Sequence, residues 1–191
     1  MINIRSKGQK GERDLCKILN DRFSTKAFKR SVQSGAFTGG KNSHRADDLT
    51  SEQSSVFIGD IITPPDFLYT IEHKCIAKFD FWDIHNKNSQ FWKWIQQAER
   101  DAVRANRDFM LVIKPNLKPR LVVMADNAKC YFPSHMYILC KGLVVMLLDD
   151  LLRSPNDFFF REKIKRQHSG ENWLWKNLQS RTRWQSRNKY H

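Results

Sequence analysis

The heptapeptide YTIEHKC, residues 69–75, alternates its side chains in the manner of a β-strand. Side chains along a strand point to opposite faces in turn. Glu72 and Lys74 therefore share one face, while Ile71 and His73 lie on the other, where we expect a buried imidazole. A Glu-x-Lys pair on a strand is most often an ordinary solvated surface, so its meaning depends on the segments around it.

The segment before this strand brings a second carboxylate toward Glu72. SVFIGDII, residues 55–62, predicts an apolar strand interrupted by Asp60. TPPD, residues 63–66, predicts a turn because proline cannot continue a β-ladder. A hairpin that turns about Asp66 pairs residues whose numbers add up to 132, and this register sets Asp60 opposite Glu72. We interpret the pair Pro65-Asp66 in TPPD as this turn, so the carboxylate of Asp66 points away from the sheet.

The expected register gives three charged groups a common chemistry. Cross-strand partners have Cβ atoms about 4.5–5.5 Å apart, so the carboxylates of Asp60 and Glu72 repel one another unless a cation lies between them. A hard divalent ion such as Mg²⁺ is bound by one or two carboxylates together with waters and phosphate oxygens. With Lys74 on the same face, the set predicts a metal-assisted phosphodiester hydrolase.

Upstream of the hairpin, the pattern predicts a helix, a strand and a loop. GERDLCKILNDRF carries apolar residues at helical spacing, which predicts an amphipathic helix over residues 8–23 with Glu12 on its first turn. AFKRSVQSGA, residues 27–36, predicts a strand that closes in a turn of small residues. Residues 37–55 are polar and aperiodic and predict a long loop, of the kind that is usually functional or disordered in compact domains.

Downstream, the pattern predicts a helix, two strands and a second helix. Aromatic and apolar residues recur at helical spacing from Phe91 to Ile95, which is typical of a helix packed on a sheet. Residues 107–116 and 117–125 predict two strands joined by a Pro-Asn turn, which extend the sheet beside the hairpin. KGLVVMLLDDLL, residues 141–152, is interpreted as a helix whose apolar surface is either buried or used for self-association.

The order of these motifs resembles the PD-(D/E)XK nuclease superfamily, and within it the Holliday junction resolvase-like branch of archaea and phages. The resemblance covers residues 5–125, including a glutamine-bearing helix and a core strand after the motifs. One departure is Gly59, which stands where the motif has proline. The matching segments are KGQKGERDL with Glu12, KRSVQSGA with Arg30, Ser34 and Gly35, GDII with Asp60, and IEHK with Glu72 and Lys74.

The resemblance implies a fold and a domain organisation. The fold is α/β, with a restriction-endonuclease-like core of order αβββαβ and a mixed central sheet flanked by helices. The nuclease domain spans residues 1–155. A basic and aromatic helical extension, residues 156–191, packs on or next to this core, and is either a solvated tail or a clamp for branched DNA.

The resemblance also implies the roles of the central residues. Asp60 and Glu72 hold a Mg²⁺ ion, for which Mn²⁺ can substitute, with help from the backbone carbonyl of His73. Lys74 positions or polarises the attacking water, and Glu12 is an additional acid at the edge of the metal.

Supporting residues follow from the same resemblance. Arg30 and Ser34 contact the scissile or a neighbouring phosphate. Gln97 supports the site from its helix, and Gln96 is the competing choice. Basic residues expected to bind DNA are Lys7, Lys10, Lys41, Arg45 and Lys78.

The composition favours a polyanionic partner. The 191 residues contain 33 Lys and Arg against 20 Asp and Glu, which gives a formal net charge of +13. Nucleic acid is the simplest partner for such a charge, and no segment has the amphipathic pattern of a membrane-surface helix. The 4 cysteines form no Cys-x-x-Cys pair, and the first residues have no apolar signal-peptide core. We therefore expect a cytoplasmic protein, located in the bacterial host cell if it is phage-encoded.

These observations predict a metal-dependent DNA endonuclease that acts on branched DNA, with a Holliday junction resolvase of DNA recombination as the leading hypothesis. By the resemblance it is a homodimer, because a four-way junction presents two equivalent strands to a two-fold axis. The alternatives left open are another PD-(D/E)XK DNA nuclease of recombination, end-processing or restriction type, a nuclease directed at RNA, and a non-catalytic nucleic-acid-binding protein of the same fold.

Overall fold

The structure, a computed structural model, describes residues 4–31, 58–126 and 137–161. Its helices are α1 (Ile4–Phe23), the 3-10 helix η2 (Phe81–Ile84), α3 (Gln90–Ala105), α4 (Leu148–Leu151) and α5 (Asn156–Phe159). Its strands are β1 (Lys29–Arg30), β2 (Ile61–Ile62), β3 (Tyr69–Ile76), β4 (Asp108–Pro115), β5 (Leu121–Ala125), β6 (Tyr137–Cys140) and β7 (Leu143–Leu147). The predicted loop over residues 37–55 and the extension from residue 162 onward lie outside the described residues.

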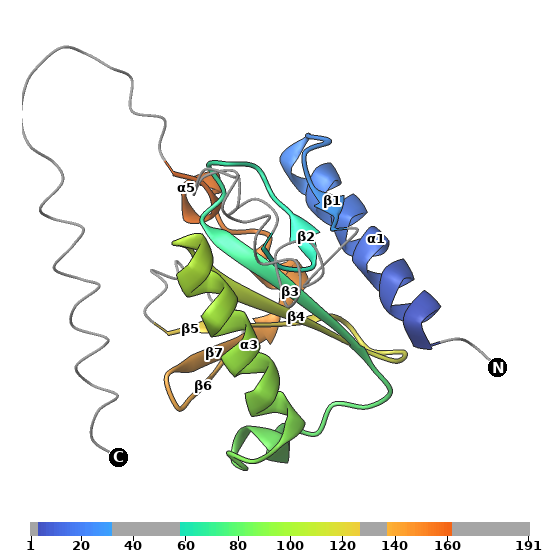
Figure 1. The fold of residues 1–191 in the computed structure, drawn as a ribbon, viewed down its shortest axis with the longest axis vertical. Coiled ribbons are helices and arrows are strands. Elements are labelled where there is room, and N and C mark those ends of the chain that lie inside the picture. The colour runs from blue at the N-terminus through green and yellow to red at the C-terminus, as the bar shows by residue number, and fades with distance from the viewer. Residues whose placement is uncertain (1–3, 32–57, 127–136, 162–191) are drawn as a thin grey trace, which may run out of the picture. The chain divides into compact units, whose positions relative to one another are not determined.

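The strands form one mixed sheet in the order β1-β2-β3-β4-β5-β7-β6 (Figure 1). The β3–β4 pair is parallel, and the other strand pairs of the described sheet are antiparallel. Parallel neighbours need a crossover connection, which η2 and α3 supply here. The predicted α/β class, the helix–three strands–helix–strand order and the mixed sheet are confirmed for the described part of the chain.

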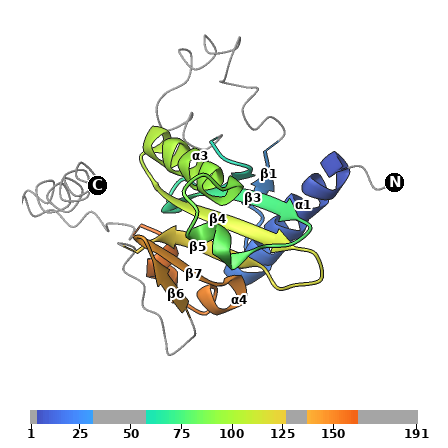
Figure 2. The same ribbon diagram turned by 90° about the horizontal axis from the view of Figure 1, so that it is seen from below.

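Helices cover both faces of the sheet because its central strands are apolar on both sides. Along β4, Met110 and Val112 pack with the apolar residues of α1, α4 and α5. The alternate residues Leu111 and Ile113 pack with α3 and η2. Figure 2 shows α3 on one side of the sheet and α4 on the other. On the α1 side, Phe158 and Phe159 of α5 are buried in the core.

Helix α1 approaches β3 closely because residue 11 is glycine. Leu15 and Leu19 of α1 are buried against the sheet. A Cβ atom at Gly11 would lie 2.4 Å from Cys75 Sγ and 2.6 Å from His73 Cε1, which is too near for any real contact. Glycine usually weakens a helix, so at this position its small size fits the packing of α1 on β3.

The segment 141–152, predicted as a helix, contains a turn and the strand β7 before a short helix, so the prediction is wrong over residues 141–147. Lys141 and Gly142 have positive φ angles of 51° and 76° and form the two-residue turn between β6 and β7. Such a turn matches the twist of a β-hairpin. Because apolar side chains on both faces of β7 are buried, its apolar run satisfies helical spacing by coincidence. A helix begins only at Leu148.

The other predicted elements are found with changed limits. Of the expected strand over residues 55–62, the described part forms β2 after a bend at residues 58–60, and residues 55–57 lie outside the described residues. The Pro65-Asp66 turn, the helix that carries Phe91 and the two strands on either side of the Pro-Asn turn are confirmed. None of the described helices is long and apolar enough to cross a membrane. The cysteines of the described segments, Cys16, Cys75 and Cys140, are free thiols.

We predict opposite effects for alanine at the two glycines of α1. Gly11→Ala places a methyl group against Cys75 and His73 and should lower the free energy of unfolding by about 1–3 kcal/mol. Gly8→Ala meets no atom within 4 Å, so the better helix propensity of alanine should raise it by up to about 1 kcal/mol. Urea denaturation of both variants measures the difference. Equal stabilities would show that α1 does not depend on this close approach.

Candidate active site

Asp60 is fixed at the end of the β2–β3 ladder by three hydrogen bonds. Ile61 pairs with Ile71, which confirms the predicted register. The Asp60 N–H donates to the Ile71 carbonyl (2.9 Å), and the Asp60 carbonyl accepts the N–H of Ser31 (2.9 Å). Oδ2 of the same residue accepts the N–H of His73 at 2.9 Å. The side chain thus takes the place of a backbone acceptor where the ladder stops, so Asp60 lies beside β3 rather than inside a regular strand.

Gly59 permits this ending. Its φ of +97° belongs to a region that side chains with a Cβ rarely adopt, and an added Cβ would lie 2.8 Å from the Ile71 carbonyl oxygen. Proline, with φ fixed near −65°, cannot adopt this conformation. The glycine that departs from the expected motif therefore has a physical reason in this chain.

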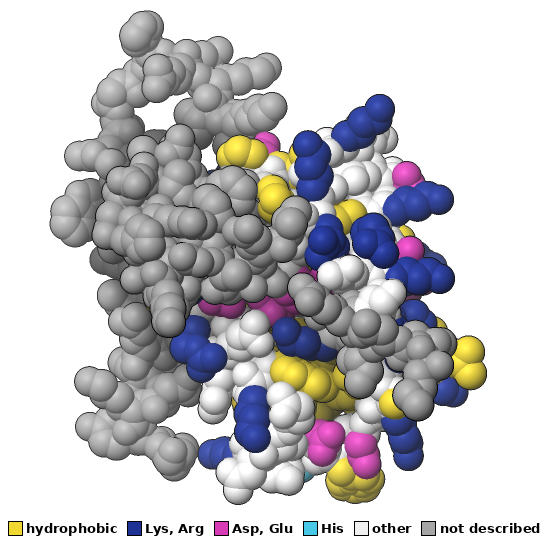
Figure 3. Space-filling model, turned by 45° about the vertical axis from the view of Figure 1, so that its right-hand side comes forward, with side chains coloured by type: hydrophobic (Ala, Val, Ile, Leu, Met, Phe, Trp, Pro, Cys, Tyr) yellow, Lys and Arg dark blue, Asp and Glu magenta, His cyan; other side chains and the backbone are white. Residues whose placement is uncertain are grey.

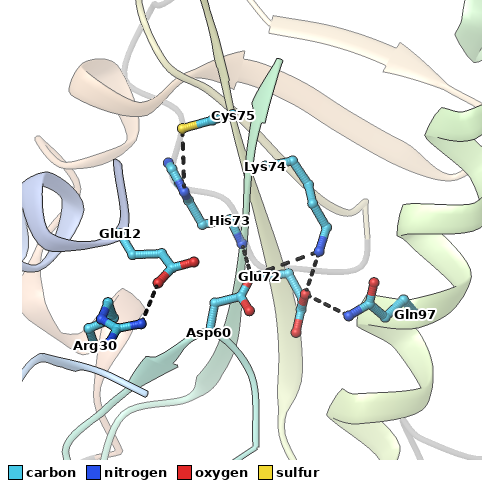
Figure 4. Close-up of polar contacts among 8 residues, drawn as sticks. All are labelled: Glu12, Arg30, Asp60, Glu72, His73, Lys74, Cys75 and Gln97. Atoms are coloured by element: carbon cyan, nitrogen blue, oxygen red, sulfur yellow. Dashed lines mark hydrogen bonds and ion pairs between the residues drawn. The ribbon is translucent and has the colours of Figure 1, made fainter. Parts of the chain in front are cut away.

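Glu72 lies on β3 with 1% of its surface exposed. Its Oε2 atom accepts hydrogen bonds from Lys74 Nζ at 3.0 Å and from Gln97 Nε2 at 2.9 Å. Lys74 Nζ also lies 3.8 Å from Asp60 Oδ2. Figure 4 shows the three charged groups close together, with contacts from the Lys74 ammonium to both carboxylates. The residues that the sequence places on one face of the hairpin are brought together by the structure.

The structure distinguishes the two candidate glutamines. Gln97 reaches Glu72 from α3, on the face of the sheet toward which Glu72 points. Gln96 is exposed. Neighbouring residues on a helix differ by about 100° in direction, so only one of the two can face β3.

The burial of two acids beside each other shapes the electrostatics of the site. Burial, and then the charge of Asp60, raises the pKa of Glu72 to about 8, against the opposing effect of Lys74. Burial acts to lower the pKa of Lys74, but the carboxylates of Glu72 and Asp60 outweigh it, so this pKa is raised. A cation placed between the acids would relieve their repulsion, which is the electrostatic condition of a metal site.

Glu12 points from α1 toward Asp60 (Figure 4) and contacts Arg30 of β1, with Oε2 and NH1 3.5 Å apart. Burial, followed by the charge of Asp60, raises the pKa of Glu12, and Arg30 opposes this shift. Arg30, which the sequence analysis expected at a phosphate, thus contacts an acid at the edge of the site. Ser34, its expected companion, lies outside the described residues.

A comparison with known protein families identifies the family of this chain. A family model described as "Phage putative PDDEXK endonuclease" matches residues 3–137, which contain Glu12, Asp60, Glu72 and Lys74. The chain belongs to this phage PDDEXK endonuclease family. No curated protein and no solved structure gives a significant match to it. The expected nuclease superfamily is confirmed, whereas the resolvase branch stays a prediction.

The acids of this PDDEXK chain fit a hard divalent ion better than a zinc ion. The described residues contain no group of three or more His, Cys, Asp and Glu side chains arranged to hold a metal. A Mg²⁺ site needs only one or two carboxylates, with waters and phosphate oxygens as the other ligands. The contacts described above use Oδ2 of Asp60 and Oε2 of Glu72, so the second oxygen of each carboxylate can serve as a ligand.

The side chain of His73 is a core group in this PDDEXK protein. It faces α1, opposite Glu72 and Lys74, and burial lowers its pKa to about 4. Its Nδ1 atom lies 4.0 Å from Cys75 Sγ, and Nε2 has no hydrogen-bond partner among the described residues. The buried imidazole was predicted from the strand pattern. The hydrogen bond from its backbone N–H to Asp60 was missed, because a backbone donor has no sequence signature.

Three of the five basic residues expected to bind DNA lie in the described part of the chain. Lys7 donates to Asn116 Oδ1, and Lys10 and Lys78 are exposed. Lys41 and Arg45 lie outside the described residues. Their contribution to DNA binding stays a prediction.

We predict that Glu72 makes the metal-free protein less stable as the pH rises. A raised pKa means that the folded state binds more protons than the unfolded state, between the ordinary value of 4.5 and about 8. His73 acts in the opposite direction only below its ordinary pKa of 6.5. In EDTA, the free energy of unfolding should fall by about 1–2 kcal/mol from pH 6.5 to pH 8.

Urea denaturation of the wild type and of Glu72→Gln over this pH range measures the effect. The variant, which has no carboxyl group to ionise, should lose most of the decline. Parallel pH profiles of the two proteins would rule out Glu72 as its source.

Proposed function

We propose that the protein is a divalent-metal-dependent DNA endonuclease that hydrolyses phosphodiester bonds in branched DNA, with four-way junctions as its substrate. The observation that carries the proposal is that Lys74 Nζ lies within 3.8 Å of carboxylate oxygens of both Asp60 and Glu72. Membership of the PDDEXK endonuclease family supports hydrolysis. The formal net charge of +13 supports nucleic acid as the substrate.

The side chains divide the chemistry among them. Asp60 and Glu72 hold Mg²⁺, for which Mn²⁺ can substitute, with the His73 carbonyl as a further ligand. The ion, when bound, supplies Lewis-acid stabilisation of charge on the phosphate and lowers the pKa of water. Lys74, already in contact with both carboxylates, orients the attacking water by hydrogen bonding and offsets the negative charge that develops on the phosphate.

The remaining residues position this group. Gln97 donates to Glu72 and so fixes the orientation of that carboxylate. Glu12 supplies a further acid at the edge of the metal, and its contact with Arg30 holds a guanidinium next to the path of the scissile phosphate. Ser34 contributes a hydroxyl to the same phosphate.

The preference for branched DNA rests on the resemblance of the Glu12 helix and the Arg30 strand to resolvase-like nucleases. A four-way junction has two equivalent scissile strands, so a homodimer would supply two active sites related by its two-fold axis. A phage resolvase of this kind would act in DNA recombination inside the bacterial host cell.

A cleavage assay tests the activity. Labelled four-way junction, flap, duplex and single-stranded DNA, together with an RNA junction, are incubated with the wild type and with Asp60→Asn, in Mg²⁺ or in EDTA. We expect product from the junction in Mg²⁺ only, and at least a 100-fold lower rate in the variant, because one of the two carboxylate ligands of the metal is lost. Binding in EDTA, measured by fluorescence anisotropy, should be retained.

Three outcomes separate the parts of the proposal. Absence of product with every metal and substrate, with binding intact, contradicts catalysis and leaves a nucleic-acid-binding protein. Equal cleavage of junction and linear duplex contradicts the branched substrate but keeps the endonuclease. Cleavage confined to the RNA junction contradicts the choice of DNA.

We predict that the two neighbouring glutamines of α3 differ in effect. Gln97→Ala removes the hydrogen bond to Glu72 and should lower the cleavage rate, or the affinity for Mg²⁺, about 10- to 100-fold. Gln96→Ala, a matched change on the exposed side of the helix, should leave both within about twofold of the wild type. A Mg²⁺ titration of the cleavage rate separates the two effects, and equal behaviour of the variants would remove Gln97 from the site.

A further inference from the structure

A basic cavity lies on the other side of β3 from Lys74. Its volume is about 160 Å³, and it is bounded by one side of α1, the end of β3 and the turn between β4 and β5. One water needs about 10–15 Å³ of such volume, so the cavity has room for a phosphate group. Its charged lining consists of Lys7, Lys10, Lys114, Arg120 and Asp14.

The positive groups of this cavity outnumber its acids, since four cations and one carboxylate, Asp14, line it. Among the described residues, none of its four cations forms an ion pair. Lys7 donates to the side-chain oxygen of Asn116, and Lys114 donates to the backbone carbonyls of Pro115 and Lys118. These acceptors are neutral, so the hydrogen bonds themselves do not cancel the charge of the two ammonium groups.

Arg120 lines the cavity and has a donor that is incompletely satisfied. Its Nε atom is buried and has no hydrogen-bond partner among the described residues. A buried donor without an acceptor is uncommon in folded proteins and costs free energy. An anion bound in the cavity would offset this cost through its charge, and a planar guanidinium is well suited to a phosphate.

The cavity lies near the proposed active site. Cys75, at its floor, follows Glu72 by three residues on β3, which corresponds to about 10 Å along the strand. The cavity and the proposed active site thus lie at the same end of the sheet, on opposite faces of β3. Figure 3, turned to bring the α1 side forward, shows many Lys and Arg side chains over this surface.

We propose that this cavity binds a backbone phosphate of the DNA strand that the active site cuts. This inference rests on the proposed function, since it assigns the cavity to the same substrate. A phosphate held here positions the strand and carries no sequence information. The contact therefore contributes to the affinity for DNA and to its salt dependence. The scissile bond itself lies at Asp60, Glu72 and Lys74.

The test measures binding of duplex and junction DNA with unphosphorylated ends in EDTA, by fluorescence anisotropy over a range of salt concentrations. Lys10→Gln and Arg120→Gln each remove one cation of the cavity, and Lys10 is exposed, so its change does not threaten the fold. Lys17→Gln is the matched control, because it removes an exposed charge from the same helix but lies outside the cavity. Thermal melting verifies that each variant is folded.

We expect each cavity variant to weaken DNA binding about 3- to 10-fold and to reduce the slope of log K against log salt by about 1. Lys17→Gln should have a smaller effect on both the DNA affinity and the salt slope. Cavity variants that behave like the control would overturn the proposal.

A separate arm titrates inorganic phosphate into the wild type and both cavity variants. Saturable phosphate binding that the variants lose, together with unchanged DNA binding, overturns the assignment to DNA in favour of a free phosphate site. Cavity-dependent DNA binding without Asp60-dependent cleavage supports the cavity and contradicts the proposed activity. A wild type that binds no DNA contradicts both.

Discussion

The hydrogen bond from the backbone N–H of His73 to the carboxylate of Asp60 is the constraint on which the site depends. It closes the β2–β3 ladder with a side chain, and charge-assisted bonds of this kind are stronger than neutral ones. Asp60 is consequently held by both of its backbone groups and by its carboxylate. The acid cannot turn away from Glu72 without breaking the end of the hairpin. Preorganisation of the metal ligand is thus part of the fold itself.

This arrangement carries an electrostatic cost in the absence of a cation. Glu72 is almost fully buried, and both burial and Asp60 raise its pKa. Lys74 and Gln97 offset part of the cost, because they donate to the same carboxylate oxygen. Clustered acids with strongly shifted pKa values are typical of functional sites, where stability is given up for chemistry. The metal-free protein therefore stores a repulsion that binding of a divalent ion would release.

The sequence predicted those features that depend on local patterns. The strand 69–75, its turn and the 61–71 pairing follow from alternation and from proline, so the approach of Asp60 to Glu72 could be predicted. The strand β7 could not be separated from a helix by its apolar run, although the turn at Lys141-Gly142 was an available signal. The choice between Gln96 and Gln97 could not be made from the sequence, because it depends on how α3 is rotated about its own axis relative to the sheet. Arg120 was missed because its cavity joins segments that are far apart in sequence.

The two faces of β3 carry different side chains, and residues of α1 lie close to both groups. Glu72 and Lys74 project to the face of the sheet where Gln97 lies, while His73 and Cys75 project toward α1. Because Gly11 lets α1 lie directly on these two side chains, the residues on either side of it are fixed relative to β3. Glu12 then reaches Asp60, and Lys10 reaches the basic cavity. A single close packing contact thereby sets the distance between the bond to be cut and the phosphate that we propose is held beside it.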